Sequence, residues 1–264
     1  MSQHSFDATA AAYDRRVGRW SRLYIPALVE AAGIKPGDRV LDVATGTGEA
    51  AIAAAAAAGP SGRVIASDIS LPMLLVAKRK VPDRPVTLVA MNGQELACRD
   101  ESVDAVLCQL GLMFFPDVDR GLQEFRRVLQ VGRWMAACVW SAPERAPFVS
   151  IFSDTMVRHV PAKREEILAW TSLADTDRLH RLLTGAGFRD VSITPERRPI
   201  SFDSFEEYWE PIEAGGSSTA ALYKDLPAAL RDTVREEVRA RMKRYESGGR
   251  LLLNSETLLA VGRK

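Results

Sequence analysis

The sequence has few cysteines and histidines, and neither set forms a metal or disulfide pattern. The cysteines are Cys98, Cys108 and Cys138, and the histidines are His4, His159 and His180. These residues lack the short spacings of zinc ligands and the even pairing of a disulfide framework. We therefore expect no metal site and a reducing compartment.

The chain also lacks an excess of either charge. Its 35 lysines and arginines are opposed by 34 acidic residues, which leaves a net charge of +1. A protein that is held to nucleic acid or to an anionic membrane by its overall field needs a basic excess. We therefore expect no nucleic-acid partner.

Long apolar runs are missing as well. The longest run of small residues, 50–59, is mostly alanine, whereas a helix needs roughly 20 apolar residues to cross a bilayer. The N-terminus does not carry the apolar segment of a signal peptide. We expect no membrane span and a cytoplasmic protein. With 47% hydrophobic residues, the chain can bury the core of a single domain over residues 1–264.

The most informative segment is residues 39–51, which read RVLDVATGTGEAA. An apolar run around Asp42 predicts a buried strand, the turn Thr45–Gly48 lets backbone approach a ligand, and an alanine-rich helix then begins. The amides at the start of that helix would point toward the ligand. A second strand-like run, 63–67, ends in Asp68, where α/β folds hold the ribose of a nucleoside. We infer a nucleoside-containing cofactor.

The spacing Gly46-x-Gly48-x-x-Ala51 also fits the fingerprint of dinucleotide-binding domains. Asp42 argues against that interpretation, because a carboxylate inside the strand would repel a pyrophosphate and favour a cationic ligand. An NAD(P)-dependent oxidoreductase remains the alternative.

Four ordered motifs resemble those of class I S-adenosylmethionine-dependent methyltransferases, in the branch of the ubiquinone/menaquinone-biosynthesis methyltransferases. The matching segments are 41–48 (LDVATGTG), 67–74 (SDISLPML), 91–96 (MNGQEL) and 100–106 (DESVDAV), followed by 109–116 (QLGLMFFP). Three positions depart from the family pattern. Ala44 replaces a glycine, Asn92-Gly93 replaces Asp-Ala, and residues 131–133 replace Pro-Gly-Gly.

The resemblance implies a role for each matched position. Asp42 would help to hold the amino-acid end of S-adenosylmethionine, the Thr45–Gly48 loop would pass beneath it, and Asp68 would bind the ribose. Asn92, with the backbone of the next residue, would contact adenine, and Gln109 would lie near the methionine portion. The full set of cofactor-binding residues expected on this basis is Asp42, Ala44, Thr45, Gly46, Thr47, Gly48, Asp68, Ile69, Met73, Asn92, Gly93, Gln94 and Gln109.

Alternating strand-like and helix-like segments predict an α/β fold with a doubly wound, mostly parallel sheet. The resemblance makes this the Rossmann-like methyltransferase fold, with seven strands and an antiparallel last strand. The expected parts are N-terminal helices in 5–32, a cofactor-binding core in 38–140, a helical cover over the substrate pocket in 143–186 and 203–247, and a last strand in 250–263.

The expected activity is methyl transfer to a small apolar or aromatic molecule. Aromatic side chains in and near the cover would wall its pocket: Phe114, Phe115, Phe148, Phe152, Trp170, Phe202, Phe205, Tyr208 and Trp209. A sulfonium methyl is already a good electrophile, so alignment can supply most of the catalysis. The general base is unknown, with Tyr13 and His159 as weak candidates. A non-catalytic adenosylmethionine-binding module and a homodimer both remain open.

Overall fold

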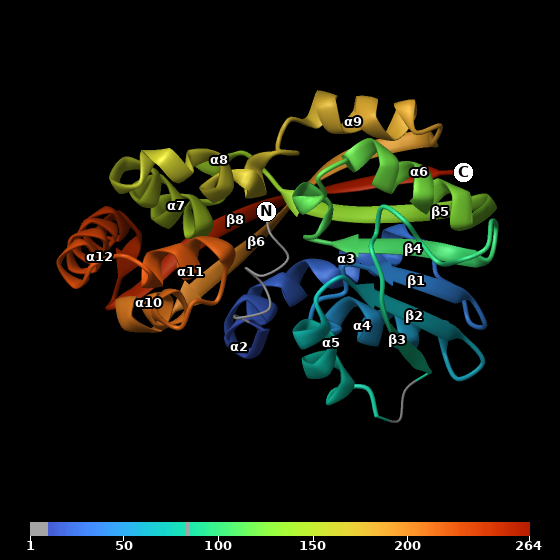
Figure 1. The fold of residues 1–264 in the computed structure, drawn as a ribbon, viewed down its shortest axis with the longest axis horizontal. Coiled ribbons are helices and arrows are strands. Elements are labelled where there is room, and N and C mark those ends of the chain that lie inside the picture. Colours follow the sequence, from blue (N-terminus) through green and yellow to red (C-terminus); the bar gives the residue numbers. More distant parts are fainter. Residues whose placement is uncertain (1–9, 83–84) are drawn as a thin grey trace.

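The computed structural model describes residues 10–82 and 85–264, without the side chains of residues 11, 12 and 14–17. A single mixed sheet with the strand order β3-β2-β1-β4-β5-β8-β6 forms its centre (Figure 1). The strands are β1 (Arg39–Val43), β2 (Arg63–Asp68), β3 (Val86–Ala90), β4 (Val103–Gln109), β5 (Leu129–Trp140), β6 (Arg189–Phe202), β7 (Glu246–Ser247) and β8 (Arg250–Arg263). The expected fold class is confirmed, and the two-residue β7, which pairs with β8, adds an eighth strand.

The first five strands are parallel neighbours, and β8 is antiparallel to both β5 and β6. A parallel strand at the centre of such a sheet is covered on both faces, so its sequence is a nearly continuous apolar run. Strand β4, which reads VDAVLCQ, is buried at every position except the last. The acid Asp42 in β1 is therefore placed in the most buried part of the molecule, with 0% of its surface exposed.

Helices cover both faces of the sheet: α3 (Ile25–Ala31), α4 (Glu49–Ala58), α5 (Leu71–Lys78), α6 (Val118–Val128) and α9 (Thr176–Gly185). Right-handed crossovers put α4 and α6 on opposite faces, because the strand order runs one way from β1 to β3 and the other way from β4 to β5. Helix α4 approaches β1 and β2 closely because its inward residues are all alanine. The reversal between β1 and β4 opens a crevice at the carboxyl ends of these strands.

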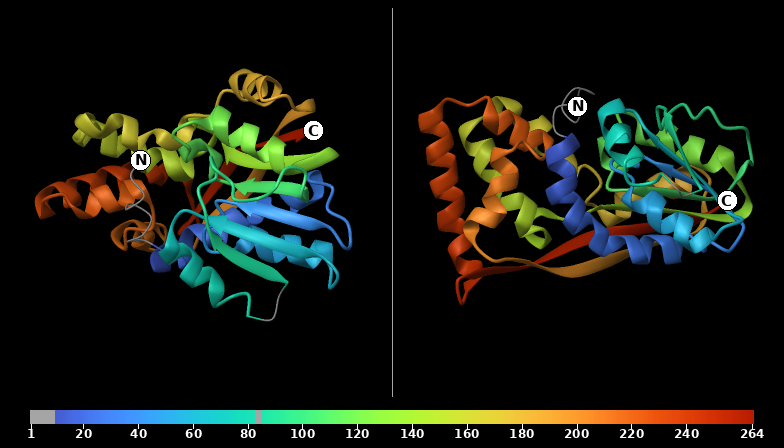
Figure 2. Two further views of the ribbon diagram at one scale, coloured as in Figure 1. Left: turned by 45° about the vertical axis from the view of Figure 1, so that its right-hand side comes forward. Right: turned by 90° about the horizontal axis from the view of Figure 1, so that it is seen from below.

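Strands β6 and β8 are each 14 residues long and extend well past the rest of the sheet (Figure 2). Their sheet-side parts belong to the main core, through Leu258 to Val261 on β8. Their far ends enter a second apolar core, through Ile200, Phe202 and Leu251. This antiparallel strand pair thus joins the sheet to a second group of helices.

The second group of helices forms the cover and contains α2 (Ala10–Ser21), α7 (Pro147–His159), α8 (Arg164–Ile167), α10 (Phe205–Glu213), α11 (Ser218–Lys224) and α12 (Ala228–Met242). The cover differs from expectation in one way. Helix α9, inside the expected segment 143–186, lies over the sheet beside α6 instead (Figure 1). The segment 203–247 is divided into three helices, because Gly215-Gly216 and Pro227 interrupt it.

At the N-terminus, α2 leads through a 3-10 turn, Arg22–Tyr24, into α3. This agrees with helices in 5–32 as far as the structure describes them, and residues 5–9 and His4 lie outside the described residues. Throughout the ranges 10–82 and 85–264, the structure contains no helix that is both long and apolar enough to span a bilayer.

Candidate active site

One cavity of about 390 Å³ lies at the carboxyl ends of β1, β2 and β4. Its size falls within the roughly 300–1,000 Å³ that is usual for small-molecule sites. The sheet supplies one end through Ala44, Asp68 and Gln109, and the cover supplies the other end through residues of α2, α7, α10 and α11. The cavity is therefore a space between two structural units, large enough for a nucleoside and part of a second molecule.

The glycine-containing turn after β1 is held in a left-handed conformation. Ala44, Gly46 and Gly48 have φ angles of 56°, 55° and 88°. Glycine adopts such angles without strain, whereas alanine does so at a cost of roughly 1–2 kcal/mol. A side chain at Gly48 would also come within 3.1 Å of Ala77 on α5. The turn thus keeps its backbone close to the cavity, where Ala44 and Gly46 form part of the wall.

Asp42 lies behind that turn and does not line the cavity. Its Oδ2 accepts a hydrogen bond of 2.5 Å from the Thr45 hydroxyl, and its Oδ1 has no hydrogen-bond partner among the described residues. Burial raises the pKa of Asp42 from 3.8 to about 7, although the Thr45 hydroxyl lowers it. Near neutral pH this carboxyl is therefore poised to gain or lose its charge in response to a nearby cation.

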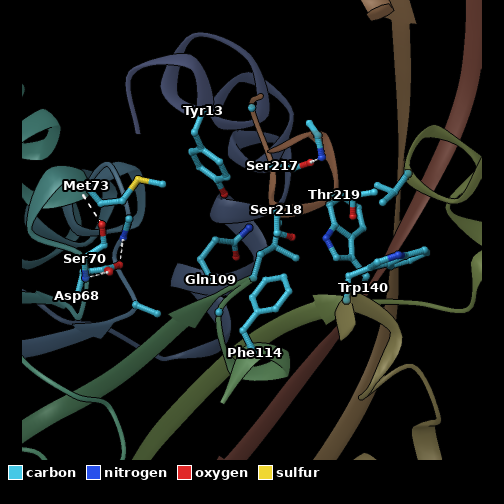
Figure 3. A pocket seen from close by; sticks show the side chains of 18 of the residues that line it. Tyr13, Asp68, Ser70, Met73, Gln109, Phe114, Trp140, Ser217, Ser218 and Thr219 are labelled. Atoms are coloured by element: carbon cyan, nitrogen blue, oxygen red, sulfur yellow. Dashed lines mark hydrogen bonds between the residues drawn. The ribbon is translucent and has the colours of Figure 1, made fainter. Parts of the chain in front are cut away.

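Asp68 is at the end of β2 and faces the cavity. Its Oδ2 accepts a hydrogen bond of 2.7 Å from the Gly46 amide, and its Oδ1 accepts one of 2.8 Å from the Ser70 amide. The carboxylate thus ties the turn after β1 to the start of α5 (Figure 3). Each carboxylate oxygen has a second lone pair, so Asp68 can still accept from ribose hydroxyls.

The loop after β3 forms the next part of the wall. The Asn92 side-chain oxygen accepts from the Gln94 amide at 3.0 Å, and the Gln94 side chain accepts from the Asp117 amide at 2.6 Å. At Gly93 an added Cβ would lie 2.4 Å from the Phe115 ring. Phe115 therefore occupies the space that the alanine expected at this position would need.

Gln109 ends β4 at the centre of the cavity wall. Its side-chain nitrogen donates to the carbonyl of Ser21 on α2 at 3.1 Å, and its side-chain oxygen is buried without a partner among the described residues. Figure 3 shows Tyr13 and Ser218 on either side of it. Gln109 thus connects the sheet to the cover and leaves one acceptor unused.

The structure brings most of the expected cofactor-binding residues to this one cavity. Those that line it are Ala44, Gly46, Asp68, Ile69, Met73, Asn92, Gly93, Gln94 and Gln109. Asp42, Thr45, Thr47 and Gly48 stand behind the wall and shape the turn. These four residues therefore determine the conformation of the turn, although they do not line the cavity.

The two candidate bases have different positions. Tyr13 lines the cavity. His159 is at the far end of α7, outside the lining, where its Nε2 lies 2.7 Å from Glu237 on α12. This contact links two helices of the cover, and it places His159 away from the cavity. Trp209, which we expected in the pocket wall, is buried within the cover and donates to Glu213.

The sequence analysis missed the segment Gly216–Ala220, which lines the end of the cavity beneath the cover. The range 203–247 was expected only as helical cover, and none of the residues 216–220 was expected to line the pocket. The signal was present in the sequence, because Gly215-Gly216-Ser217-Ser218-Thr219 combines two helix-breaking glycines with residues that begin helices. The Ser217 side chain does accept from the Ala220 amide and starts α11 there.

These residues fit S-adenosylmethionine. The unused oxygen of Gln109 can accept from the cofactor's ammonium group, and the Asp68 carboxylate can accept from its ribose hydroxyls. A purine can lie beside the loop after β3, where Asn92 and Gly93 line the cavity. The ammonium group, the ribose and the purine of the cofactor thus each find a group of suitable chemistry on the sheet side.

The sheet topology and the glycine turn define a class I methyltransferase, an enzyme that uses S-adenosylmethionine. Within that class, the chain belongs to the ubiE/COQ5 methyltransferase family, whose model matches residues 6–194. This removes the oxidoreductase and the non-catalytic module as alternatives. The matched range ends early in β6, so α10, α11 and α12 of the cover lie beyond it.

Two relatives illustrate the family. The chain is 33% identical over 209 residues to a demethylmenaquinone methyltransferase of Renibacterium salmoninarum, covering 71% of this chain and 83% of that protein. It is 30% identical over 203 residues to a demethylmenaquinone methyltransferase of Streptomyces griseus, covering 71% and 86%.

Solved structures share the fold at lower identity. The YcgJ protein of Bacillus subtilis has a TM-score of 0.61 at 18% identity, covering 91% of this chain and 97% of that one. Phosphoethanolamine N-methyltransferase 2 of Haemonchus contortus, solved with S-adenosyl-L-methionine, has a TM-score of 0.62 at 17% identity, covering 98% and 57%. At these identities the likeness establishes the fold alone.

Proposed function

We propose that this enzyme methylates an uncharged, oxygen-bearing aromatic ring of the quinol type. The observation that carries the proposal is the wall of the cavity beyond Gln109, where Trp140, Phe148, Phe152 and Tyr208 supply aromatic surface. Flat aromatic walls favour a flat apolar acceptor. The activity named for the curated relatives, methylation of demethylmenaquinone, is of this kind.

The charge of the cavity supports the same acceptor class. Asp68 is the only carboxylate or cationic side chain among the described residues that line it. Asp68 lies at the cofactor end, so the acceptor end presents hydroxyl, indole and aromatic groups. A phosphorylated or otherwise anionic acceptor would be desolvated there without a counter-ion, which is costly.

The catalytic contribution of the chain is alignment. When bound, the cofactor supplies a methyl group activated by a sulfonium. Asp68, Asn92 and Gln109 would fix it from the sheet side, while the aromatic wall holds the acceptor on the far side. Such positioning can contribute roughly 7–11 kcal/mol to lowering a barrier. We propose that Tyr13, from α2, closes over the transfer position and helps to exclude water.

The test is methyl transfer from isotopically labelled S-adenosylmethionine to 1,4-dihydroxynaphthalene, the reduced form of 1,4-naphthoquinone, with the product identified by mass. We expect one labelled methyl group on the ring system. Phosphoethanolamine serves as the charged comparison acceptor. Transfer to phosphoethanolamine with none to the aromatic ring would overturn the proposal.

A further inference from the structure

The acceptor end of the cavity contains three hydrogen-bond donors that the protein itself leaves unused. Trp140, Ser218 and Thr219 line the cavity and are 7%, 9% and 7% exposed. No described residue hydrogen-bonds to the Trp140 indole N–H or to either hydroxyl. Figure 3 shows the three side chains around the same space.

The donor atoms of these three residues are open to the cavity rather than fully buried, so a bound molecule can reach them. Neighbouring hydroxyls of the cover do have partners. Ser153 on α7 donates to the Ser150 carbonyl at 3.2 Å, and Tyr208 on α10 donates to the Phe148 carbonyl at 3.3 Å. The three unused donors thus differ from these two hydroxyls, and they meet at the boundary between β5 and α11.

We infer that Trp140, Ser218 and Thr219 form a subsite that binds a ring oxygen of the acceptor. An indole N–H can only donate, so the group it meets must be an acceptor such as a carbonyl, phenol or phenolate oxygen. The aromatic walls beside these residues hold the ring itself, as in the function proposed above, on which this inference rests. The subsite, which we call the oxygen subsite, selects oxygenated rings over plain hydrocarbons of the same shape.

The oxygen subsite is a property of this chain beyond its family match. Ser218 and Thr219 lie past residue 194, where that match ends, and on a helix that begins only because Gly215-Gly216 breaks the one before it. Trp140 lies within the matched range at the end of β5. The subsite thus combines a strand end that lies within the family match with a cover segment that lies outside it. In this arrangement, the cover would determine which acceptor is bound.

The experiment measures the affinity of the enzyme, saturated with S-adenosylhomocysteine, for naphthalene, 1-naphthol and 1,4-dihydroxynaphthalene. Wild type is expected to bind the oxygenated rings at least about tenfold more tightly than naphthalene, from one or two additional hydrogen bonds. Trp140→Phe, Ser218→Ala and Thr219→Val should each reduce that preference about three- to tenfold. Affinity for S-adenosylhomocysteine should stay within about twofold of wild type, and so should affinity for naphthalene in the Ser218→Ala and Thr219→Val variants.

Two variants serve as controls. Ser153→Ala removes a hydroxyl from the same cavity that already has a protein partner, so the preference for oxygenated rings should not change. Thr219→Ser keeps the hydroxyl and should keep the preference, which a purely steric role for Thr219 would not predict. An equal loss of affinity for naphthalene and for the oxygenated rings would overturn the oxygen subsite.

The two proposals can fail separately. Methyl transfer to 1,4-dihydroxynaphthalene with an unchanged preference in all three variants overturns the subsite and leaves the proposed function standing. Binding that depends on the three donors, without methyl transfer by wild type, overturns the proposed function and supports the subsite. A wild type that neither binds nor methylates any of these rings overturns both.

Discussion

Asp42 and Asp68 lie near the ends of neighbouring strands, yet their surroundings give them different properties. Asp68 faces the cavity and accepts hydrogen bonds from two backbone amides, which stabilise its negative charge. Asp42 is fully buried, and one of its oxygens has no partner among the described residues. Two residues of the same type thus give two separate predictions.

Asp42→Asn should change how stability depends on pH. Burial raises the pKa of Asp42 from 3.8 to about 7, so the folded chain keeps this proton over a range in which the unfolded chain has lost it. The stabilisation from Asp42 is therefore full below about pH 4 and is lost as the pH rises to about 7. Relative to Asp42→Asn, wild type should lose about 3–4 kcal/mol of unfolding free energy over that range, because each pKa unit corresponds to about 1.4 kcal/mol.

Urea unfolding of both proteins at pH 4 to 8 measures this difference. Asp104→Asn is the control with the opposite sign, because hydrogen bonds and charge from Arg39 outweigh burial and lower the pKa of Asp104. The contribution of Asp104 is lost only as the pH falls below its ordinary pKa of 3.8, so this control should show little change between pH 4 and 8. Parallel profiles for wild type and Asp42→Asn would show that Asp42 is not held protonated by the fold.

Asp68→Ala should weaken binding of S-adenosylhomocysteine at least tenfold, since each charge-assisted hydrogen bond to a ribose hydroxyl is worth about 1.5–3 kcal/mol. It should also lower thermal stability, because two loop amides lose their acceptor. Ser70→Ala separates the two effects. It removes the cap of α5, at a cost of about 1 kcal/mol, and leaves the Asp68 carboxylate in place. Calorimetry showing equal affinity losses in both variants would place the ribose elsewhere.

At the scale of elements, the cofactor loops are positioned by one aromatic ring. Phe115, which follows β4 and precedes α6, fits between Gly93 and Gly121, and a Cβ at either glycine would come within 2.6 Å of the ring. The ring also contacts Phe125 of α6 edge-on, with centroids 6.0 Å apart. The loop after β3 and helix α6 are thus packed on opposite sides of Phe115.

Gly93→Ala should therefore destabilise the protein by about 1–3 kcal/mol and weaken cofactor binding, because a methyl group 2.4 Å from Phe115 forces the loop to shift. Thermal unfolding and calorimetry measure the two effects. Gly185→Ala is the matched control, since this helical glycine has open space around it and should be neutral or slightly stabilised. Restoration by Phe115→Leu in the Gly93→Ala background would identify the clash, and no restoration would contradict it.

At the scale of the whole molecule, the cavity lies between two apolar cores that are joined by the antiparallel strands β6 and β8 and by α2. The lining residues at the proposed cofactor end come from the sheet, and those at the proposed acceptor end come mainly from the cover. This division predicts that mutations can separate cofactor affinity from acceptor use.

Phe152→Leu tests the separation. Phe152 lines the cavity from α7 and packs edge-on against Trp209 and Tyr223 in the cover. Its truncation should raise the KM for the aromatic acceptor several-fold, while affinity for S-adenosylhomocysteine changes less than about twofold. Steady-state kinetics and calorimetry on one preparation provide both values. A matching loss of cofactor affinity would mean that the two ends of the cavity are not independent.

The sequence by itself determined the sheet, the cofactor and the turn that holds it. These depend on local patterns, namely apolar runs with an acid at the end and glycines where φ must be positive, and such patterns can be read without knowing what packs against them. Asp68, Asn92 and Gln109 were placed correctly beside one cavity because parallel strands end at the same edge.

Only the tertiary structure decided how the cover is built. Helix α9 lies over the sheet, His159 pairs with Glu237, and Trp209 is buried away from the cavity. An apolar stripe on a helix specifies that a face is buried, but it does not specify which of two cores buries it. The donors at Ser218 and Thr219 became visible only when long-range packing brought α11 opposite the end of β5, since the acceptor site is made by contacts between distant segments.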